Sequence, residues 1–190
     1  MKETSYFERF CRILDTNLES IQNQVPQLAD MITQTWKNGG TVFVMGNGGS
    51  DSSAQHFVID CLSIRHTINI PINAEALSSN TSVITAIAND LGYEHVFSKQ
   101  LERKLKSVDL CIFLSASGNS PNLLKACEFA RNSSVKTVGI LGFDGGSLGK
   151  QVDFVIQVET EIGQYGICED VHLSILHATV EIIRELANSD

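Results

Sequence analysis

The sequence has no run of 18 consecutive apolar residues, the minimum that is read as a membrane-spanning helix. Its opening stretch, M-K-E-T-S-Y-F-E-R-F, mixes charges of both signs and contains no continuous apolar segment of the kind found in secretory leaders. We therefore expect a cytoplasmic protein without a membrane partner.

Cysteine is scarce, odd in number and unpaired along the sequence. No two cysteines form a C-x-x-C pair, and the five residues are Cys11, Cys61, Cys111, Cys127 and Cys168. Most of them lie inside apolar runs, as buried thiols do in proteins of a reducing compartment. The pattern does not indicate a disulfide framework.

Positive charge is also in short supply. There are 14 lysines and arginines against 22 acidic residues, which gives a net charge of −8. Because nucleic acids are held largely by basic surfaces, this balance argues against a nucleic-acid partner. An anionic ligand would have to be bound by local dipoles.

With 190 residues, 43% of them hydrophobic, the chain fits one domain of ordinary size. There is no internal repeat, low-complexity tract or linker that would divide it. We therefore expect a single domain over residues 1–190, made of an N-terminal helix within 1–38 and an α/β core over 39–190.

Apolar residues recur at steps of three and four from about Glu3 to Lys37, which predicts a long amphipathic helix that could break near Pro26. The following Asn38-Gly39-Gly40 predicts a left-handed C-cap. A helix of this length cannot lie entirely on one small sheet. We therefore expect part of it to pack on another subunit.

Strands and helices alternate through the rest of the chain. The predicted strands are 41–45, 70–73, 109–114, 137–141 and 154–158, and the predicted helices are 50–63, 79–88, 93–105, 121–132 and 167–187, with a short helical turn near Ser147. Such alternation implies crossover connections. The predicted fold is a three-layer α/β/α sandwich with a parallel sheet of about five strands covered on both faces.

Two predicted strands end in loops of small residues that lead into helices, namely G-N-G-G-S (Gly46–Ser50) and S-A-S-G-N-S (Ser115–Ser120). Ligands of open α/β sheets bind at the carboxyl ends of the strands. Helix N-termini and serine hydroxyls there would suit a phosphate monoester. Either loop alone could be an ordinary strand-to-helix turn, and neither matches a dinucleotide or P-loop pattern, so we expect no nucleotide cofactor.

Four side chains could together hold a metal ion. His56 and Asp60 are four residues apart on one predicted helix and therefore share a face. Glu169 and His177 lie eight apart on the last helix and point within roughly 80° of each other. Two imidazoles and two carboxylates on two helices can form a tetrahedral site for a divalent ion such as zinc.

Any one of these residues could instead be a hydrogen-bonded structural group. We give that interpretation to His66 and His95, which have no obvious partners in the sequence, and we expect His172 to support the structure or the site rather than act directly. Because His56 and Asp60 follow a candidate ligand loop, we favour a metal site for the set of four.

Several motifs, taken in order, resemble the sugar isomerase (SIS) domain family and, within it, the phosphoheptose isomerases. They are G-N-G-G-S with A-Q-H-F, A-I-A-N-D with G-Y-E-H-V-F-S-K-Q, S-A-S-G-N-S-P-N, F-D-G-G, and E-D-V-H-L with the later L-H. The resemblance covers essentially the whole chain. It implies isomerisation of D-sedoheptulose 7-phosphate to D-glycero-D-manno-heptose 7-phosphate for lipopolysaccharide or capsule, a homotetramer built by the long first helix, and a zinc ion.

The resemblance also assigns roles to individual positions. Sugar contacts fall on Asn47, Gly48, Gly49, Ser50, Asn89 and Asp90, phosphate contacts on Ser115, Ser117 and Ser120, and zinc ligands on His56, Asp60, Glu169 and His177, with Ala116 and Glu169 also contacting the substrate. The sequence departs from the family at this site. Asp60 replaces a glutamate, Glu169 a glutamine and Ala116 a threonine; Leu141 and Ile167 replace polar residues.

Aldose–ketose isomerisation passes through an enediolate, so it requires a base, an acid and stabilisation of an oxyanion. We expect Asp60 or Glu169 to remove the proton and His177 to exchange one with a substrate oxygen. The alternatives are a non-catalytic SIS scaffold of the replication-initiation type, which binds a partner protein, or an isomerase or sensor of another sugar phosphate. The presence of His177, which such scaffolds tend to lose, favours catalysis.

Overall fold

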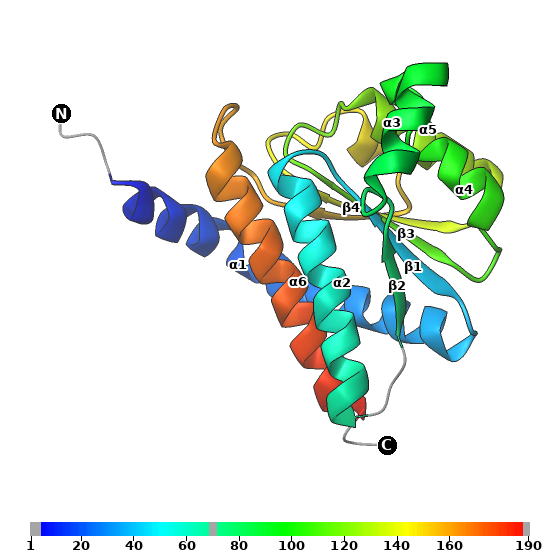
Figure 1. Cartoon of the computed structure of the whole chain (residues 1–190). Coiled ribbons are helices and arrows are strands. Elements are labelled where there is room, and N and C mark those ends of the chain that lie inside the picture. The colour runs from blue at the N-terminus through cyan, green and yellow to red at the C-terminus, as the bar shows by residue number, and fades with distance from the viewer. Residues whose placement is uncertain (1–4, 69–71, 188–190) are drawn as a thin grey trace.

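The computed structural model describes residues 5–68 and 72–187 and contains one five-stranded parallel sheet between two layers of helices (Figure 1). The strand order is β2-β1-β3-β4-β5, and each strand pairs in parallel with its neighbours. The strands are β1 (Thr41–Met45), β2 (Asn73–Ala76), β3 (Leu110–Ser115), β4 (Lys136–Leu141) and β5 (Phe154–Gln157). The predicted parallel sheet is confirmed.

Both faces of the sheet are covered, because successive strand residues point to opposite sides. On β3, Ile112 belongs to the core beneath one helical layer, and Phe113 to the core beneath the other. One layer consists of α1 (Tyr6–Lys37), α2 (Gly49–Ile68) and α6 (Tyr165–Ala187); the other consists of α3 (Thr81–Leu91), α4 (Ser98–Lys104) and α5 (Pro121–Asn132) (Figure 1). The three-layer sandwich is therefore confirmed.

The first helix is continuous across Pro26, so a break there is not observed. Pro26 is exposed, and water can therefore satisfy the carbonyl oxygen of Gln22 that a proline leaves without its helical partner. A capping box at Ser5 fixes the start of the helix, and Gly39, with a φ of 71°, ends it in the left-handed conformation that was expected.

Two predicted elements differ from those observed in place or continuity, and the helices expected over 50–63 and 79–88 extend further, to Ile68 and Leu91. The short strand expected at 70–73 lies at Asn73–Ala76, and residues 70 and 71 fall outside the described part of the chain. The single helix expected over 93–105 is divided into a 3₁₀ turn, η1 (Tyr93–His95), and α4. Val96 and Phe97, between these two elements, are buried. The apolar residues of this segment therefore mark a bend into the core and not one continuous helix.

The strand order places the two small-residue loops next to each other. β1 and β3 are adjacent, with Met45 opposite Phe113, and the helices that follow them, α2 and α5, lie on opposite faces of the sheet (Figure 1). Such a divergence opens a crevice at the carboxyl ends of the two strands, where ligands of doubly wound sheets bind. The fold thus brings Gly46–Ser50 and Ser115–Ser120 to one edge.

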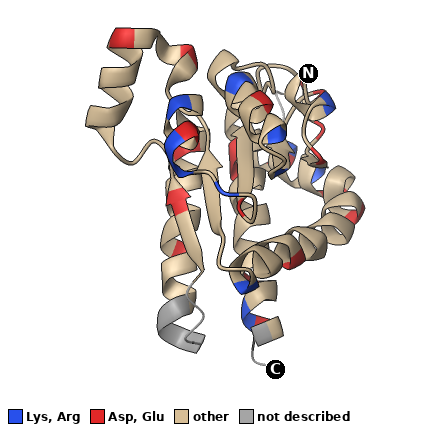
Figure 2. Cartoon of the chain, turned by 90° about the vertical axis from the view of Figure 1, so that its right-hand side faces the viewer, with Lys and Arg blue, Asp and Glu red and all other residues tan. Residues whose placement is uncertain are grey.

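Basic and acidic residues occur together on the same side of the molecule (Figure 2). Figure 2 shows basic and acidic residues interspersed over the side of the molecule that it presents. Among the described helices, none combines the length and the apolar character needed to cross a bilayer.

Candidate functional site

The loop after β1 brings the start of α2 close to α6. A Cβ atom added at Gly49 would collide with the carboxylate of Glu169, so only glycine permits this approach. Gly48 has a φ of 57°, which turns the chain into the helix. Ser50, in the first turn of α2, is buried. The loop therefore presents its backbone, rather than bulky side chains, to the crevice.

The loop after β3 is shaped by its own hydroxyl groups. Ser115 Oγ accepts a hydrogen bond of 3.0 Å from the Gly118 amide, and Ser117 Oγ accepts one of 3.3 Å from the Asn119 amide. Ser120 is the N-cap of α5, yet within the described chain its side chain makes no capping hydrogen bond. Its hydroxyl can thus be offered to an anion at the positive end of α5, although Pro121 has no amide hydrogen and the Leu123 amide already donates to Ser120 and Asn122.

Gly118 and Ala116 fit this second loop closely against its surroundings. Gly118 has a φ of 62°, and a Cβ there would collide with the carbonyl oxygen of Gly145 in the F-D-G-G segment. Ala116 is buried beside Phe143 and Cys168, so its side chain packs and does not reach the crevice. Any contact of Ala116 with a ligand would come from its backbone.

Asn47 joins the first loop to the start of α5, directly after the second loop, and to η1. Its Nδ2 donates to Asn122 Oδ1 at 3.0 Å, and its Oδ1 accepts from Asn122 Nδ2 at 2.9 Å and from the Tyr93 hydroxyl at 2.9 Å. Neither Asn122 nor Tyr93 was identified from the sequence. The P-N and G-Y pairs inside the motifs were visible, but only the fold shows that both side chains meet Asn47.

A small cavity of about 170 Å³ opens beside the first loop. Its lining residues come from that loop, α2, α3, η1 and the segments just before α3 and α4: Gly46, Asn47, Gly48, Asp51, Ser78, Thr81, Ile84, Tyr93 and Phe97. Asn89 and Asp90, predicted to reach sugar hydroxyls, are exposed in the last turn of α3, where Asn89 donates to Asp90 at 2.9 Å. The structure places them apart from this lining.

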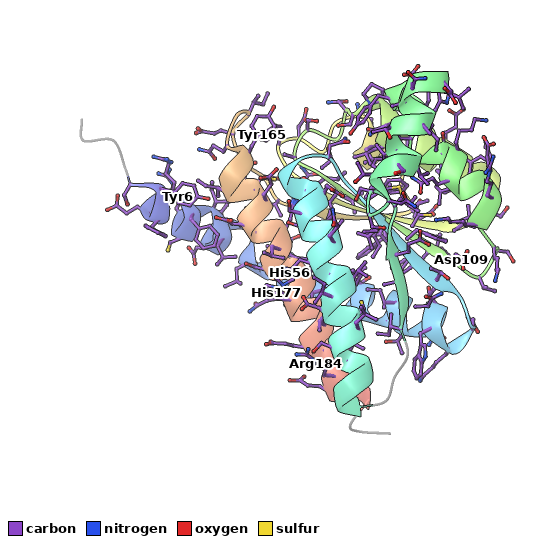
Figure 3. The ribbon with its side chains drawn as sticks, in the orientation of Figure 1. Tyr6, His56, Asp109, Tyr165, His177 and Arg184 are labelled. Carbon is purple, nitrogen blue, oxygen red and sulfur yellow. The ribbon has the colours of Figure 1, made fainter. Side chains whose placement is uncertain are left out.

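Three of the four expected metal ligands converge between α2 and α6 (Figure 3). The Nε2 atoms of His56 and His177 are 3.2 Å apart, and Asp60 Oδ2 lies 3.7 Å from the first and 3.5 Å from the second. Nearly half of each imidazole side chain is exposed, at 48% and 46%, so this cluster can be reached from solvent.

The residues of this cluster fit a divalent cation. Ligands at 2.0–2.1 Å from a tetrahedral ion stand roughly 3.3 Å from each other, close to the separations observed here. Asp60 Oδ2 is buried and has no hydrogen-bond partner among the described residues, although it lies between two imidazoles. An ion would satisfy this oxygen.

Glu169 lies elsewhere. Within the part of the chain that the structure describes, it is not a member of the group formed by His56, Asp60 and His177, and its carboxylate lies against Gly49. The step of eight residues from Glu169 to His177 leaves their side chains roughly 80° apart around the helix, and it also advances about 12 Å along the axis. The structure thus places one carboxylate with the imidazoles and the other at the first loop.

His172, for which a supporting role was expected, lies buried beneath the site. Only 1% of it is exposed, and its Nε2 is 3.3 Å from Cys168 Sγ. Burial lowers the pKa of His172 from 6.5 to about 4 and raises the pKa of the Cys168 thiol to about 12. The pair is therefore a neutral imidazole beside a neutral thiol, which packs the core.

This burial predicts a loss of stability in acid. Between about pH 6.5 and pH 4 the unfolded chain binds a proton on His172 that the folded chain does not, so stability present above pH 6.5 is lost as the pH falls. The expected slope is about 1.4 kcal/mol per pH unit. Urea unfolding of wild type and His172→Gln at pH 7 and pH 5 measures it; an equal loss in both proteins would contradict the prediction.

Comparisons with known proteins identify relatives over nearly the whole chain. A model of the SIS domain matches residues 5–142. The phosphoheptose isomerase of Chlorobaculum parvum is 39% identical over 178 residues, which cover 92% of this chain and 84% of the relative. Solved phosphoheptose isomerases from Neisseria gonorrhoeae and Francisella tularensis superpose with a TM-score of 0.87 each, at 28% and 29% identity, over 95% of both chains.

Proposed function

The chain belongs to the SIS domain family, and from that premise we propose that it is a phosphoheptose isomerase, an aldose–ketose isomerase acting on D-sedoheptulose 7-phosphate. Its product, D-glycero-D-manno-heptose 7-phosphate, would supply heptose for lipopolysaccharide or capsule. One observation carries the proposal: the two loops that can bind an anion lie next to each other at one edge of the sheet. Carboxylate and imidazole side chains on the neighbouring helices α2 and α6 lie beside them. The whole chain acts as one domain.

The two loops divide the substrate between them. Ser115, Ser117, Ser120, the backbone of Ala116 and the N-terminus of α5 bind the phosphate without a basic side chain. The backbone at Asn47, Gly48 and Gly49, with Ser50 beside it, binds the sugar, and Asn89 and Asp90 reach its outer hydroxyls. This division is supported by the serine hydroxyls at one loop, where the Ser120 side chain makes no capping hydrogen bond, and by the Glu169 carboxylate at the other.

The reaction moves one proton between neighbouring carbons. Glu169 removes the proton from C1 while the carbonyl oxygen on C2 gains one, which gives an enediol; return of a proton to C2 and loss of the hydroxyl proton on O1 complete the aldose. His177, expected from the sequence to exchange protons with the oxygens, lies instead with the proposed metal ligands, about two turns along α6 from Glu169. The position of Glu169 beside the first loop supports its role as base, and Asp60, between two imidazoles, is better placed as a ligand.

We further propose that His56, Asp60 and His177 hold a zinc ion. Two imidazole nitrogens and one carboxylate oxygen are a donor set that zinc accepts, and they leave a position open on the solvent side. Bound there, zinc would polarise the oxygens of the diol. Glu169, expected from the sequence as a fourth ligand, would have to move to join the set.

Substrate NMR tests the function. The purified protein is incubated with sedoheptulose 7-phosphate, and in parallel with a hexulose phosphate and a pentulose phosphate, while the anomeric signals of the aldose are followed. We expect turnover of the heptulose phosphate in preference to the other two. Absence of turnover with all three would refute an isomerase, and preference for a shorter sugar would reassign the substrate.

Replacing Gly49 with alanine should disable the base without unfolding the protein. The added Cβ displaces only the flexible end of Glu169, and a shift of about 1 Å in a catalytic group can cost about a hundredfold in rate. Gly149→Ala is the matched control, because its Cβ would make an ordinary contact of 3.4 Å with Leu141. Equal turnover of the two variants, measured by the same NMR assay, would contradict this role of Gly49.

We also propose that the chain assembles as a homotetramer through α1. The N-terminal half of α1 extends past the sheet, and Phe7 there is 76% exposed (Figure 1). An apolar groove of about 350 Å³ lies between α1 and α6 and is lined mainly by Leu14, Leu18, Ile21, Val25, Val171, Ile175, Ala178 and Ile182. Both features are what a helical subunit interface requires. Sedimentation as a monomer would refute this assembly.

A further inference from the structure

Asn122 is a buried amide that lies between the two halves of the proposed site. Only 2% of the residue is exposed, although it stands in the first turn of α5, directly after the loop proposed to bind phosphate. Its Oδ1 accepts from Asn47 Nδ2 and, at 3.0 Å, from the Leu123 amide, and its Nδ2 donates to Asn47 Oδ1. A buried amide with this many partners has one orientation.

Most of the hydrogen-bonding capacity of the Asn47 side chain is used by partners within the protein. Its Oδ1 accepts from both Asn122 and Tyr93, which uses the two lone pairs of an amide oxygen. One N–H of its Nδ2 is used by Asn122. Asn47 therefore meets a substrate chiefly through its backbone, while its side chain fixes where that backbone stands.

Tyr93 is in turn fixed to α5, the helix that carries Asn122. Lys125 Nζ on α5 lies 3.1 Å from the Nε2 of His95, and 3.9 Å from the carboxylate of Glu94. The η1 turn that contains Tyr93 is thereby attached to α5 at one end, and to Asn47 through the Tyr93 hydroxyl at the other. Asn47 is thus held from two sides by groups anchored on one helix.

We propose that Asn122 and Tyr93 are positioning residues that set the distance between the phosphate-binding loop and the sugar-binding loop. The inference rests on the proposed function, because a sugar phosphate must occupy both loops at once. The phosphate fixes one end of the substrate at Ser115–Ser120, and the reacting carbons must then reach Glu169 beside Gly49. A change in loop spacing would misplace those carbons without affecting the phosphate site itself.

Two ligands of different length distinguish an effect on loop spacing from a general effect on folding. Tyr93→Phe and Asn122→Ala are compared with wild type by calorimetric titration with sedoheptulose 7-phosphate and with inorganic phosphate. We expect the dissociation constant of the sugar phosphate to rise about fivefold in Tyr93→Phe, which loses one hydrogen bond, and about thirtyfold in Asn122→Ala, which loses two or more. The dissociation constant of inorganic phosphate, which occupies one loop only, should change less than twofold.

Matched controls exist for both changes. Tyr165 is 53% exposed, close to the 55% of Tyr93, and its hydroxyl has no hydrogen-bond partner in the described chain, so Tyr165→Phe removes the same group without consequence. Asn17 is a buried amide, 5% exposed, that bonds to the backbone of Glu159 and Ile13 and to neither loop. Asn17→Ala should lower the melting temperature as Asn122→Ala does, yet bind the sugar phosphate normally.

An equal rise in the dissociation constants of both ligands would overturn the inference. So would a lower melting temperature with both dissociation constants unchanged. If wild type neither binds nor isomerises sedoheptulose 7-phosphate, the proposed function fails first, and amide hydrogen exchange then tests the spacing role separately. Faster exchange at residues 46–49 and 115–120 in Asn122→Ala, but not in Asn17→Ala, is the expected result. Unchanged exchange in both loops would refute it.

Discussion

Glu169→Gln should retain bound metal and lose about a thousandfold in turnover of sedoheptulose 7-phosphate, whereas Asp60→Asn should lose both metal and turnover. The two carboxylates differ in position, and for that reason the two variants should differ in metal content. Asp60 Oδ2 lies between the imidazoles of His56 and His177, and Glu169 lies against Gly49. An amide in place of Asp60 removes the anionic ligand, and an amide in place of Glu169 removes the base only.

The size of the effect follows from what glutamine preserves. Glutamine has the shape of glutamate and can still accept hydrogen bonds, but it does not take up a proton at neutral pH. What is lost is therefore general base catalysis, which contributes roughly a hundredfold to ten-thousandfold in enzymes. Substrate affinity should change much less than the turnover number.

Metal content by mass spectrometry and turnover by NMR are measured on the same preparations. Asp170→Asn is the matched control: it neutralises a carboxylate next to Glu169 that instead accepts a 2.5 Å hydrogen bond from the Tyr6 hydroxyl. That variant should keep both properties. Loss of metal in Glu169→Gln would show that Glu169 is a ligand, and wild-type turnover in both Asp60→Asn and Glu169→Gln would show that neither carboxylate is the base.

The fold could be predicted because its signals are local. Continuous apolar runs such as residues 110–114 mark buried parallel strands, and Pro121 after a serine marks a helix start; both were found where predicted. The prediction of secondary structure failed where buried residues do not follow the regular spacing of a helix or a strand. The segment from Tyr93 to Leu105 reads as one amphipathic helix, yet Val96 and Phe97 bend it into the core.

The site could be predicted only in part, because its parts depend on distance as well as on pattern. His56 and Asp60 are one helical turn apart, so spacing alone placed them together. Glu169 and His177 point within roughly 80° of each other but are two turns apart, and the axial distance separates them. Asn122 and Tyr93 contact Asn47 over separations of 75 and 46 residues, which no local pattern encodes.

Zinc should raise the melting temperature of the protein by roughly 5–10 °C, and chelation should reverse the increase. The cluster joins α2 to α6, so an ion bound by His56, Asp60 and His177 binds the folded state and has no equivalent site in the unfolded chain. At a free zinc concentration about a hundred times the dissociation constant, the gain is about 2.7 kcal/mol. For a domain of this size each kcal/mol corresponds to roughly 2–4 °C.

Two histidine variants decide whether this increase arises at the cluster. His177→Ala removes one of the two imidazoles and should abolish the zinc-dependent shift, although the exposed position of His177 means that the fold itself should survive. His95→Ala removes an imidazole whose partner is Lys125, and it should leave the shift intact. Differential scanning calorimetry with zinc and with chelator measures all three proteins. A shift that persists in His177→Ala would place the ion elsewhere, because two remaining ligands on α2 alone cannot join that helix to α6.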